Sequence, residues 1–258
     1  MIGLLGKKVG MTQIFDKEGN DVPVTVLEVG PCTVLQLKTE ESDGYQAVQL
    51  GFDDKKEVRT SQPELGHFKK YQSAPKRFVR EIRTSTLEGL APGKTVRVNN
   101  FAVGDYVDVA GTSMGRGFQG VVKRHGFKGG PSSHGSMSGR VAGSIGSNTD
   151  PGRVLKGLKM PGRMGGEQVT VQSMRVERID FENHLMLVRG AVPGSENGYV
   201  VVREGLKRRR PRKWRLPEEG MEELKLPEKK ISVKKVRKVQ VEAKKKPAAG
   251  TAGAKPKK

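Results

Sequence analysis

The chain reads Val22-Pro23-Val24-Thr25-Val26 near its start, with a valine at every second position. A period of two in apolar residues is typical of a strand with one buried face. Further β-prone runs follow at 33–37 and 46–50, and turn residues such as Gly30-Pro31 and Ser42-Asp43-Gly44 separate them. Short strands joined by such turns predict an antiparallel β-barrel or sandwich.

Strand patterns return further along the chain, on both sides of a long loop. They occur at 96–110, 168–172, 174–181, 185–189 and 199–202. The polar segment 54–95 carries three prolines and includes helix-tolerant stretches near 62–72 and 76–88. We therefore expect a partly helical insertion at one end of the barrel.

These patterns predict a mainly β protein of three parts. The first is an antiparallel β-barrel body made by residues 1–110 and 167–206, including the insertion at about 54–95. The second is a long extended internal loop at 111–166, and the third is a basic, largely disordered C-terminal extension at 207–258. Loops longer than about 15 residues are usually functional or disordered, so the loop is either a linker or a segment ordered by a partner. Its non-repetitive sequence favours a defined partner.

The basic charge of the chain is unevenly distributed. The whole chain holds 48 Lys and Arg against 28 Asp and Glu, a net charge of +20. Residues 1–110 hold 15 basic and 15 acidic residues, and residues 167–202 are slightly acidic. The excess lies in the loop, with nine basic residues and the single acid Asp150, and in the C-terminal extension. A neutral body with two basic extensions indicates a polyanionic partner.

Other features exclude several classes of protein. The single Cys32 forms no internal disulfide and fits a reducing compartment. No secretory signature and no run of 18 apolar residues is found, so we expect no membrane span. The four histidines do not cluster at ligand spacing, so no metal site is expected.

The loop combines glycine, cations and a few aromatic rings. Its 16 glycines permit close approach to another backbone, and its arginines and lysines suit phosphate. Its aromatic side chains suit stacking on unpaired bases or filling of gaps; they are Phe118, His125, Phe127 and His134. Ordering so long a loop costs on the order of 1 kcal/mol per residue, so we predict that it is mobile in the free protein. A solvated flexible loop remains the alternative, although it does not explain the near absence of acids.

Two nucleotide-binding motifs are matched only in part. Gly115-Arg116-Gly117-Phe118-Gln119-Gly120 fits G-x-G-x-x-G, but only five residues separate it from Gly126, too few for a crossover helix. Residues 89–95 resemble a P-loop that is one residue short. We therefore predict turns rather than nucleotide sites at both places.

Longer motifs carry a family resemblance. Residues 1–13, Met-Ile-Gly-Leu-Leu-Gly-Lys-Lys-Val-Gly-Met-Thr-Gln, and residues 115–125 resemble signatures of the large-ribosomal-subunit protein three family, bacterial type. The segments 143–146, 160–165 and 169–172 are similar to that family as well. The resemblance covers residues 1 to about 206, and the extension beyond inherits nothing from it.

The resemblance implies a structural constituent of the large ribosomal subunit with a body like the translation-factor β-barrel. It implies rRNA binding near the 3′ region of the large rRNA, an early role in assembly, and proteins fourteen and nineteen of the subunit as neighbours. It also implies that the loop runs toward the peptidyl-transferase centre, with its tip at Ser147, Asn148, Thr149 and Asp150. Some bacteria methylate a glutamine at the tip; Thr149 stands at the matching position, so that modification is expected to be absent.

From the residues and the resemblance together we predict a set of rRNA-binding side chains. They are Lys7, Lys8, Arg116, Phe118, Lys123, Arg124, His125, Lys128, His134, Arg140, Arg153, Lys156, Lys159, Arg163, Lys207, Arg208, Arg209 and Arg210. No catalytic residue, cofactor, small-molecule substrate, membrane partner or obligate homo-oligomer is expected. An RNA-modifying enzyme and a free nucleic-acid chaperone driven by the basic extension remain alternatives.

Overall fold

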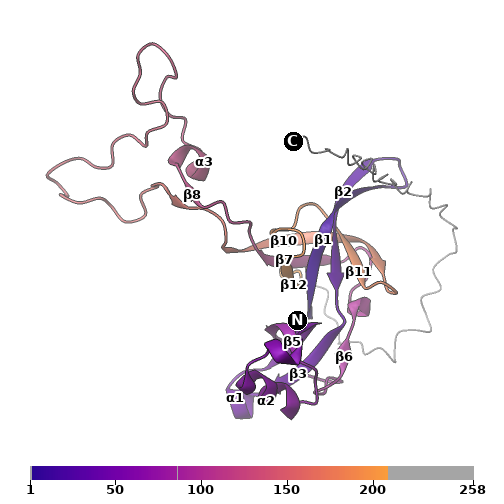
Figure 1. The fold of residues 1–258 in the computed structure, drawn as a ribbon. Helices are drawn as coiled ribbons and strands as arrows, with labels where there is room; N and C mark the ends of the chain where they lie inside the picture. The colour runs from indigo at the N-terminus through magenta and orange to yellow at the C-terminus, as the bar shows by residue number, and fades with distance from the viewer. Residues whose placement is uncertain (1, 86, 209–258) are drawn as a thin grey trace, which may run out of the picture. The chain divides into compact units, whose positions relative to one another are not determined.

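The computed structural model describes residues 2–85 and 87–208 of the chain (Figure 1). Six strands form the larger sheet: β1 (Gly3–Phe15), β2 (Asp21–Val29), β7 (Tyr106–Thr112), β10 (Gln168–Asp180), β11 (Leu185–Arg189) and β12 (Tyr199–Glu204). They close a barrel in the order β1-β12-β7-β10-β11-β2, and every neighbouring pair is antiparallel. The predicted antiparallel β-barrel is therefore confirmed.

A second sheet packs against the barrel. It contains β3 (Cys32–Lys38), β4 (Ala47–Asp54), β5 (Lys76–Arg83) and β6 (Thr95–Val96), in the order β5-β4-β3-β6. The runs at 33–37 and 46–50 are strands as predicted, but they belong to this sheet and not to the barrel. Periodicity identifies a strand without identifying its neighbours.

The segment between β4 and β6 is only partly helical. The expected helix near 62–72 is present as α2 (Gln62–Lys70), and the 3₁₀ turn η1 (Glu57–Arg59) precedes it. The short α1 (Glu40–Asp43) lies between β3 and β4, and the 3₁₀ turn η2 (Val98–Asn100) follows β6. The expectation of helix near 76–88 is wrong, because residues 76–83 form β5 and pair with β4. Burial of Ile82 in the core and the ladder with β4 outweigh the helix tolerance of the sequence.

One hydrophobic core joins the two sheets. Leu5 and Leu27 of the barrel belong to the same buried cluster as Leu50 and Ile82 of the second sheet. The Cys32 thiol lies in this core and donates to the carbonyl of Leu5 at 3.3 Å. Burial raises the pKa of this thiol to about 12, so it stays protonated and packs as an apolar group.

The long loop leaves the barrel between β7 and β10 through a paired stem. The Ser113 N–H donates to the carbonyl of Glu167 at 2.9 Å, and the Arg116 N–H donates to that of Met164 at 2.8 Å. Beyond them β8 (Phe118–Gln119) pairs with β9 (Gly162–Arg163), and α3 (Val121–His125) follows β8. Val121 of this short helix is buried in the stem.

The remainder of the loop, residues 128–159, contains no helix or strand (Figure 1). The basic extension predicted at 207–258 lies outside the described residues except for Lys207 and Arg208. Within the described ranges, no helix has both the length and the apolar character needed to span a membrane.

Candidate nucleic-acid interface

The cations of the loop are exposed and unpaired with acids. Eight of the nine, all but the half-buried Arg124, are exposed. No ion pair found among residues 2–85 and 87–208 includes a loop cation. The loop therefore offers an uncompensated positive surface, and an external anion can meet it without displacing an internal partner.

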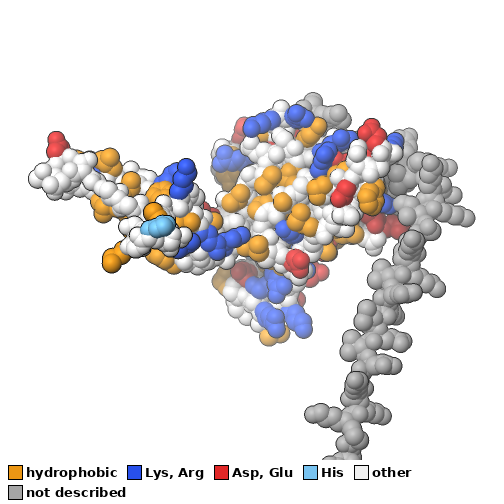
Figure 2. All heavy atoms as spheres, turned by 90° about the horizontal axis from the view of Figure 1, so that it is seen from above, with side chains coloured by type: hydrophobic (Ala, Val, Ile, Leu, Met, Phe, Trp, Pro, Cys, Tyr) orange, Lys and Arg blue, Asp and Glu red, His pale blue; other side chains and the backbone are white. Residues whose placement is uncertain are grey.

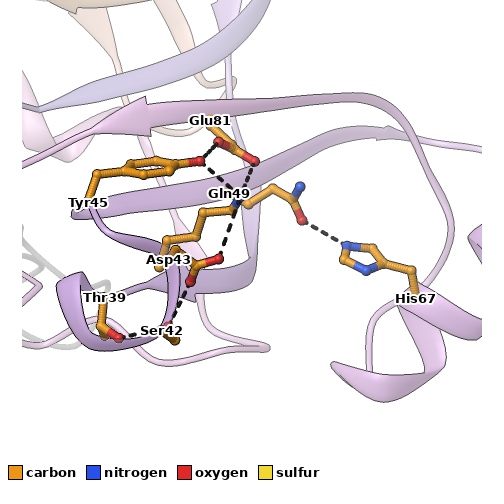
Figure 3. A network of polar contacts seen from close by, with 8 residues as sticks. Thr39, Ser42, Asp43, Tyr45, Gln49, His67 and Glu81 are labelled. Atoms are coloured by element: carbon orange, nitrogen blue, oxygen red, sulfur yellow. Dashed lines mark hydrogen bonds and ion pairs between the residues drawn. The ribbon is translucent and has the colours of Figure 1, made fainter.

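The second sheet shows the opposite arrangement (Figure 3). Lys38 donates to the Tyr45 hydroxyl at 2.9 Å and lies 3.2 Å from a carboxylate oxygen of Glu81. The hydrogen bond to Tyr45 and that to Glu81 raise the pKa of the Lys38 ammonium. Tyr45 in turn donates to Glu81 at 2.9 Å. The charge of Lys38 is thus neutralised within the protein, unlike that of the loop cations.

Arg124 and His125 help to hold the stem in shape. The Arg124 guanidinium donates to the carbonyl of Met160 at 2.8 Å, and a ring nitrogen of His125 lies 3.1 Å from the same oxygen. A Cβ on Gly162 would come 2.6 Å from the Arg124 guanidinium, so the absence of a side chain there allows this approach. Arg124 therefore joins the two sides of the stem and retains its charge for an external partner.

Large apolar side chains are also exposed along the loop, between the cations (Figure 2). Phe118 is 75% exposed and Met137 is 97% exposed. The same holds for Met114, Val141, Ile145, Val154, Leu155 and Leu158. Exposed apolar groups interspersed with cations are typical of an interaction surface, and unpaired bases offer both stacking faces and phosphates to such a surface.

The predicted tip lies in the irregular part of the loop. Ser147, Asn148, Thr149 and Asp150 are all exposed, and Asn148 has a φ of 98°, a backbone conformation that glycine and asparagine tolerate best. His134 is exposed as well, at some distance along the chain from the stem residue His125. The structure therefore does not bring together all the predicted loop residues. It groups Arg116, Phe118, Arg124, His125 and Arg163 at the stem.

The two lysines predicted near the N-terminus differ in their surroundings. Lys7 is half-buried, whereas Lys8 is 9% exposed. The Lys8 ammonium donates to the carbonyls of Val192 at 2.8 Å and Gly194 at 3.2 Å. In this structure Lys8 ties β1 to the segment between β11 and β12, and its charge is turned away from solvent.

Replacement of Lys8 by methionine is expected to destabilise the fold. The change leaves the buried carbonyl of Val192 and the part-buried carbonyl of Gly194 without their donor, which costs about 1–3 kcal/mol in the free energy of unfolding. The matched variant Lys7→Met should change that free energy by less than about 0.5 kcal/mol. Urea unfolding of both variants measures the difference. Equal stabilities would contradict a structural role for Lys8.

The predicted basic cluster after residue 206 is described only in part. Lys207 and Arg208 are exposed, and the Arg208 guanidinium lies 4.6 Å from the centre of the Tyr106 ring. Arg209 and Arg210 lie outside the described residues. No group of three or more His, Cys, Asp or Glu side chains suited to a metal ion occurs in the part of the chain that the structure describes.

The structure also shows a groove whose lining lies outside the predicted rRNA-binding residues. It lies where the loop leaves the barrel, between β5 of the second sheet and β12. Phe78 and Arg80 of β5 line it together with Tyr199 of β12. Phe78 and Arg80 are two positions apart, a spacing that puts both on one face of a strand. The expectation of helix at 76–88 hid this signal.

Comparisons with known proteins agree with this arrangement. The model of the family described as "Ribosomal protein L3" matches residues 91–184, which include the whole loop. The chain is 54% identical over 205 residues to "Large ribosomal subunit protein uL3" of Halalkalibacterium halodurans, covering 80% of this chain and 98% of that protein. It is 52% identical over 206 residues to the protein of the same name from Herpetosiphon aurantiacus, covering 80% and 97%.

Proposed function

This chain belongs to the ribosomal protein L3 family, and from that membership we propose that it binds large-subunit rRNA chiefly through the loop at 111–166. The family makes it a structural protein of the large ribosomal subunit, located in the cytoplasmic ribosome. The observation that carries the proposal is the set of nine loop cations, none of them in an ion pair within the described residues. Phosphates are the partners that such a set lacks.

We further propose that the body, the loop and the C-terminal extension have different roles in binding. The body at 1–110 and 167–206 fixes the protein at the subunit surface, near the 3′ region of the rRNA and beside proteins fourteen and nineteen. The loop neutralises phosphates and carries its tip, Ser147 to Asp150, toward the peptidyl-transferase centre. The extension at 207–258 adds non-specific attraction. Ordering of the loop and the rRNA together on binding suits a protein that joins the subunit early in its assembly.

Co-sedimentation with large subunits tests the proposal. The full chain and a variant ending at residue 208 are both expected to travel with large subunits in a sucrose gradient, because the body and loop are intact in each. A free chaperone driven by the extension would lose RNA binding on truncation. Failure of the full chain to co-sediment would contradict the proposal.

The salt dependence of rRNA binding gives a second measurement on the truncated chain. If all nine loop cations met phosphates, the logarithm of the binding constant would fall with that of the salt concentration at a slope of roughly −6 to −8. The magnitude of this slope is an upper limit, since Arg124 also forms a hydrogen bond within the stem. A slope near zero would exclude the loop as an electrostatic contact.

A further inference from the structure

The groove beside the root of the loop has the composition of an RNA-binding site. Its volume is about 900 Å³, and no carboxylate is among the residues that line it. Phe78, Arg80 and Tyr199 line it together with Ser113 and Met114, which lie near the start of the loop. The groove is therefore continuous with the proposed rRNA-binding surface.

A column of stacked planar groups forms its wall. The Tyr199 and Phe78 rings are parallel within 8°, with centres 4.9 Å apart. The Arg80 guanidinium lies 5.3 Å from the centre of the Phe78 ring. Tyr199 is held from behind, because its hydroxyl donates to Asp53 at 2.6 Å and Phe52 packs against it edge-on. The column is thus fixed at its Tyr199 end and exposed at its Arg80 end.

Charge near the column favours an anionic occupant. Arg77 is paired with Asp53 at 3.7 Å, so its charge is already balanced within the protein. Arg80 forms no ion pair within residues 2–85 and 87–208. A planar cation on an aromatic stack offers a base a stacking face and a phosphate a pair of donors.

We propose that this groove binds a single-stranded segment of rRNA, with one unstacked base resting on the Arg80 guanidinium. The proposal rests on rRNA binding by this protein and extends it to a surface outside the loop. The base extends the Tyr199–Phe78–Arg80 column by one plane. Ser113 and Gln168, the polar lining residues near the root of the loop, meet the sugar and the edge of the base.

The test compares three variants of the full chain assembled into large subunits. Arg80→Ala removes plane and charge, Arg80→Lys keeps the charge alone, and Arg83→Ala is the matched control. Arg83 lies three positions along β5, packs 5.3 Å from the Tyr45 ring and faces away from the groove. Both Arg80 variants should retain the wild-type melting temperature, because Arg80 is exposed.

Dimethyl sulfate probing of the assembled rRNA is the decisive measurement. At least one unpaired base should gain reactivity in the Arg80→Ala and Arg80→Lys subunits and stay protected in Arg83→Ala subunits. Loss of one stacked base should weaken binding of rRNA by about 5- to 150-fold. The salt slope should change by about 0.7–0.9 only for Arg80→Ala.

Three results would overturn the inference. Identical reactivity in all subunits would exclude a base at Arg80. A photoreactive side chain at Gln168 that cross-links to a protein would assign the groove to a protein neighbour. If the wild-type chain fails to bind rRNA, the proposed function fails as well, whereas the first two results leave it intact.

Discussion

Removal of residues 131–158, bridged by a short Gly-Ser linker, is expected to leave a folded barrel and to prevent maturation of the large subunit. No residue of that segment is buried, and the core of the protein draws nothing from it. The deletion spares Met160, whose carbonyl accepts from Arg124 and His125, so the stem should persist. The melting temperature should therefore stay close to that of the full chain.

The loss of RNA binding follows from charge. The deletion removes Arg140, Arg153 and Lys156. Three phosphate contacts contribute about 2–3 to the salt slope. Between 1 M and 0.15 M salt such a slope changes the affinity by a factor on the order of 100, and the deletion should lose that factor at 0.15 M salt. Filter binding to rRNA fragments measures the affinity. Sucrose-gradient profiles of ribosomal subunits from cells that carry the deletion measure maturation.

A control separates charge from the rest of the loop. The full-length variant with glutamine at positions 140, 153 and 156 should match the deletion in salt slope. It should retain any contribution of the exposed apolar side chains, such as Met137 and Ile145. Normal yields of mature large subunits from cells that carry the deletion would contradict the proposed role of the loop.

Gly165→Ala is expected to weaken rRNA binding without affecting the barrel. Gly165 has a φ of 73° in the stem, and a Cβ there would overlap the carbonyl oxygen of Met114. The left-handed backbone and this overlap together strain the paired stem by about 1–3 kcal/mol. Binding must supply that free energy, so the affinity for rRNA should fall by roughly 5- to 150-fold.

The matched control for Gly165→Ala is Gly115→Ala. Gly115 lies in the same stem, has no positive φ, and has no atom within 4 Å of the place of a Cβ. Its affinity for rRNA should therefore remain that of the wild type. Hydrogen exchange at the Arg116 amide, which donates to Met164, should accelerate only in Gly165→Ala. Equal behaviour of the two variants would show that the paired stem does not matter for binding.

Much of the fold was predictable because it depends on local pattern. The valines at 22, 24 and 26 lie in β2, and the runs at 106–109 and 185–189 lie in β7 and β11. The division of the strands between the barrel and the second sheet was not predictable, since it depends on distant partners: β1 pairs with β12 almost two hundred residues later in the chain. For the same reason residues 76–83, which are tolerant of helix, become a strand once β4 is beside them.

The sequence by itself determined the composition of the interface. Glycine, positive charge and the near absence of acid in residues 111–166 are properties of the residues, and they imply a polyanionic partner whatever the fold. Only the tertiary structure decided which cations face solvent. Lys8 is used on the carbonyls of Val192 and Gly194, Arg124 joins the stem, and Arg80 is stacked on Phe78 over a ring from β12. Each of these depends on atoms brought together by the barrel from distant parts of the chain, and hydrogen bonds and stacking act only at such short range.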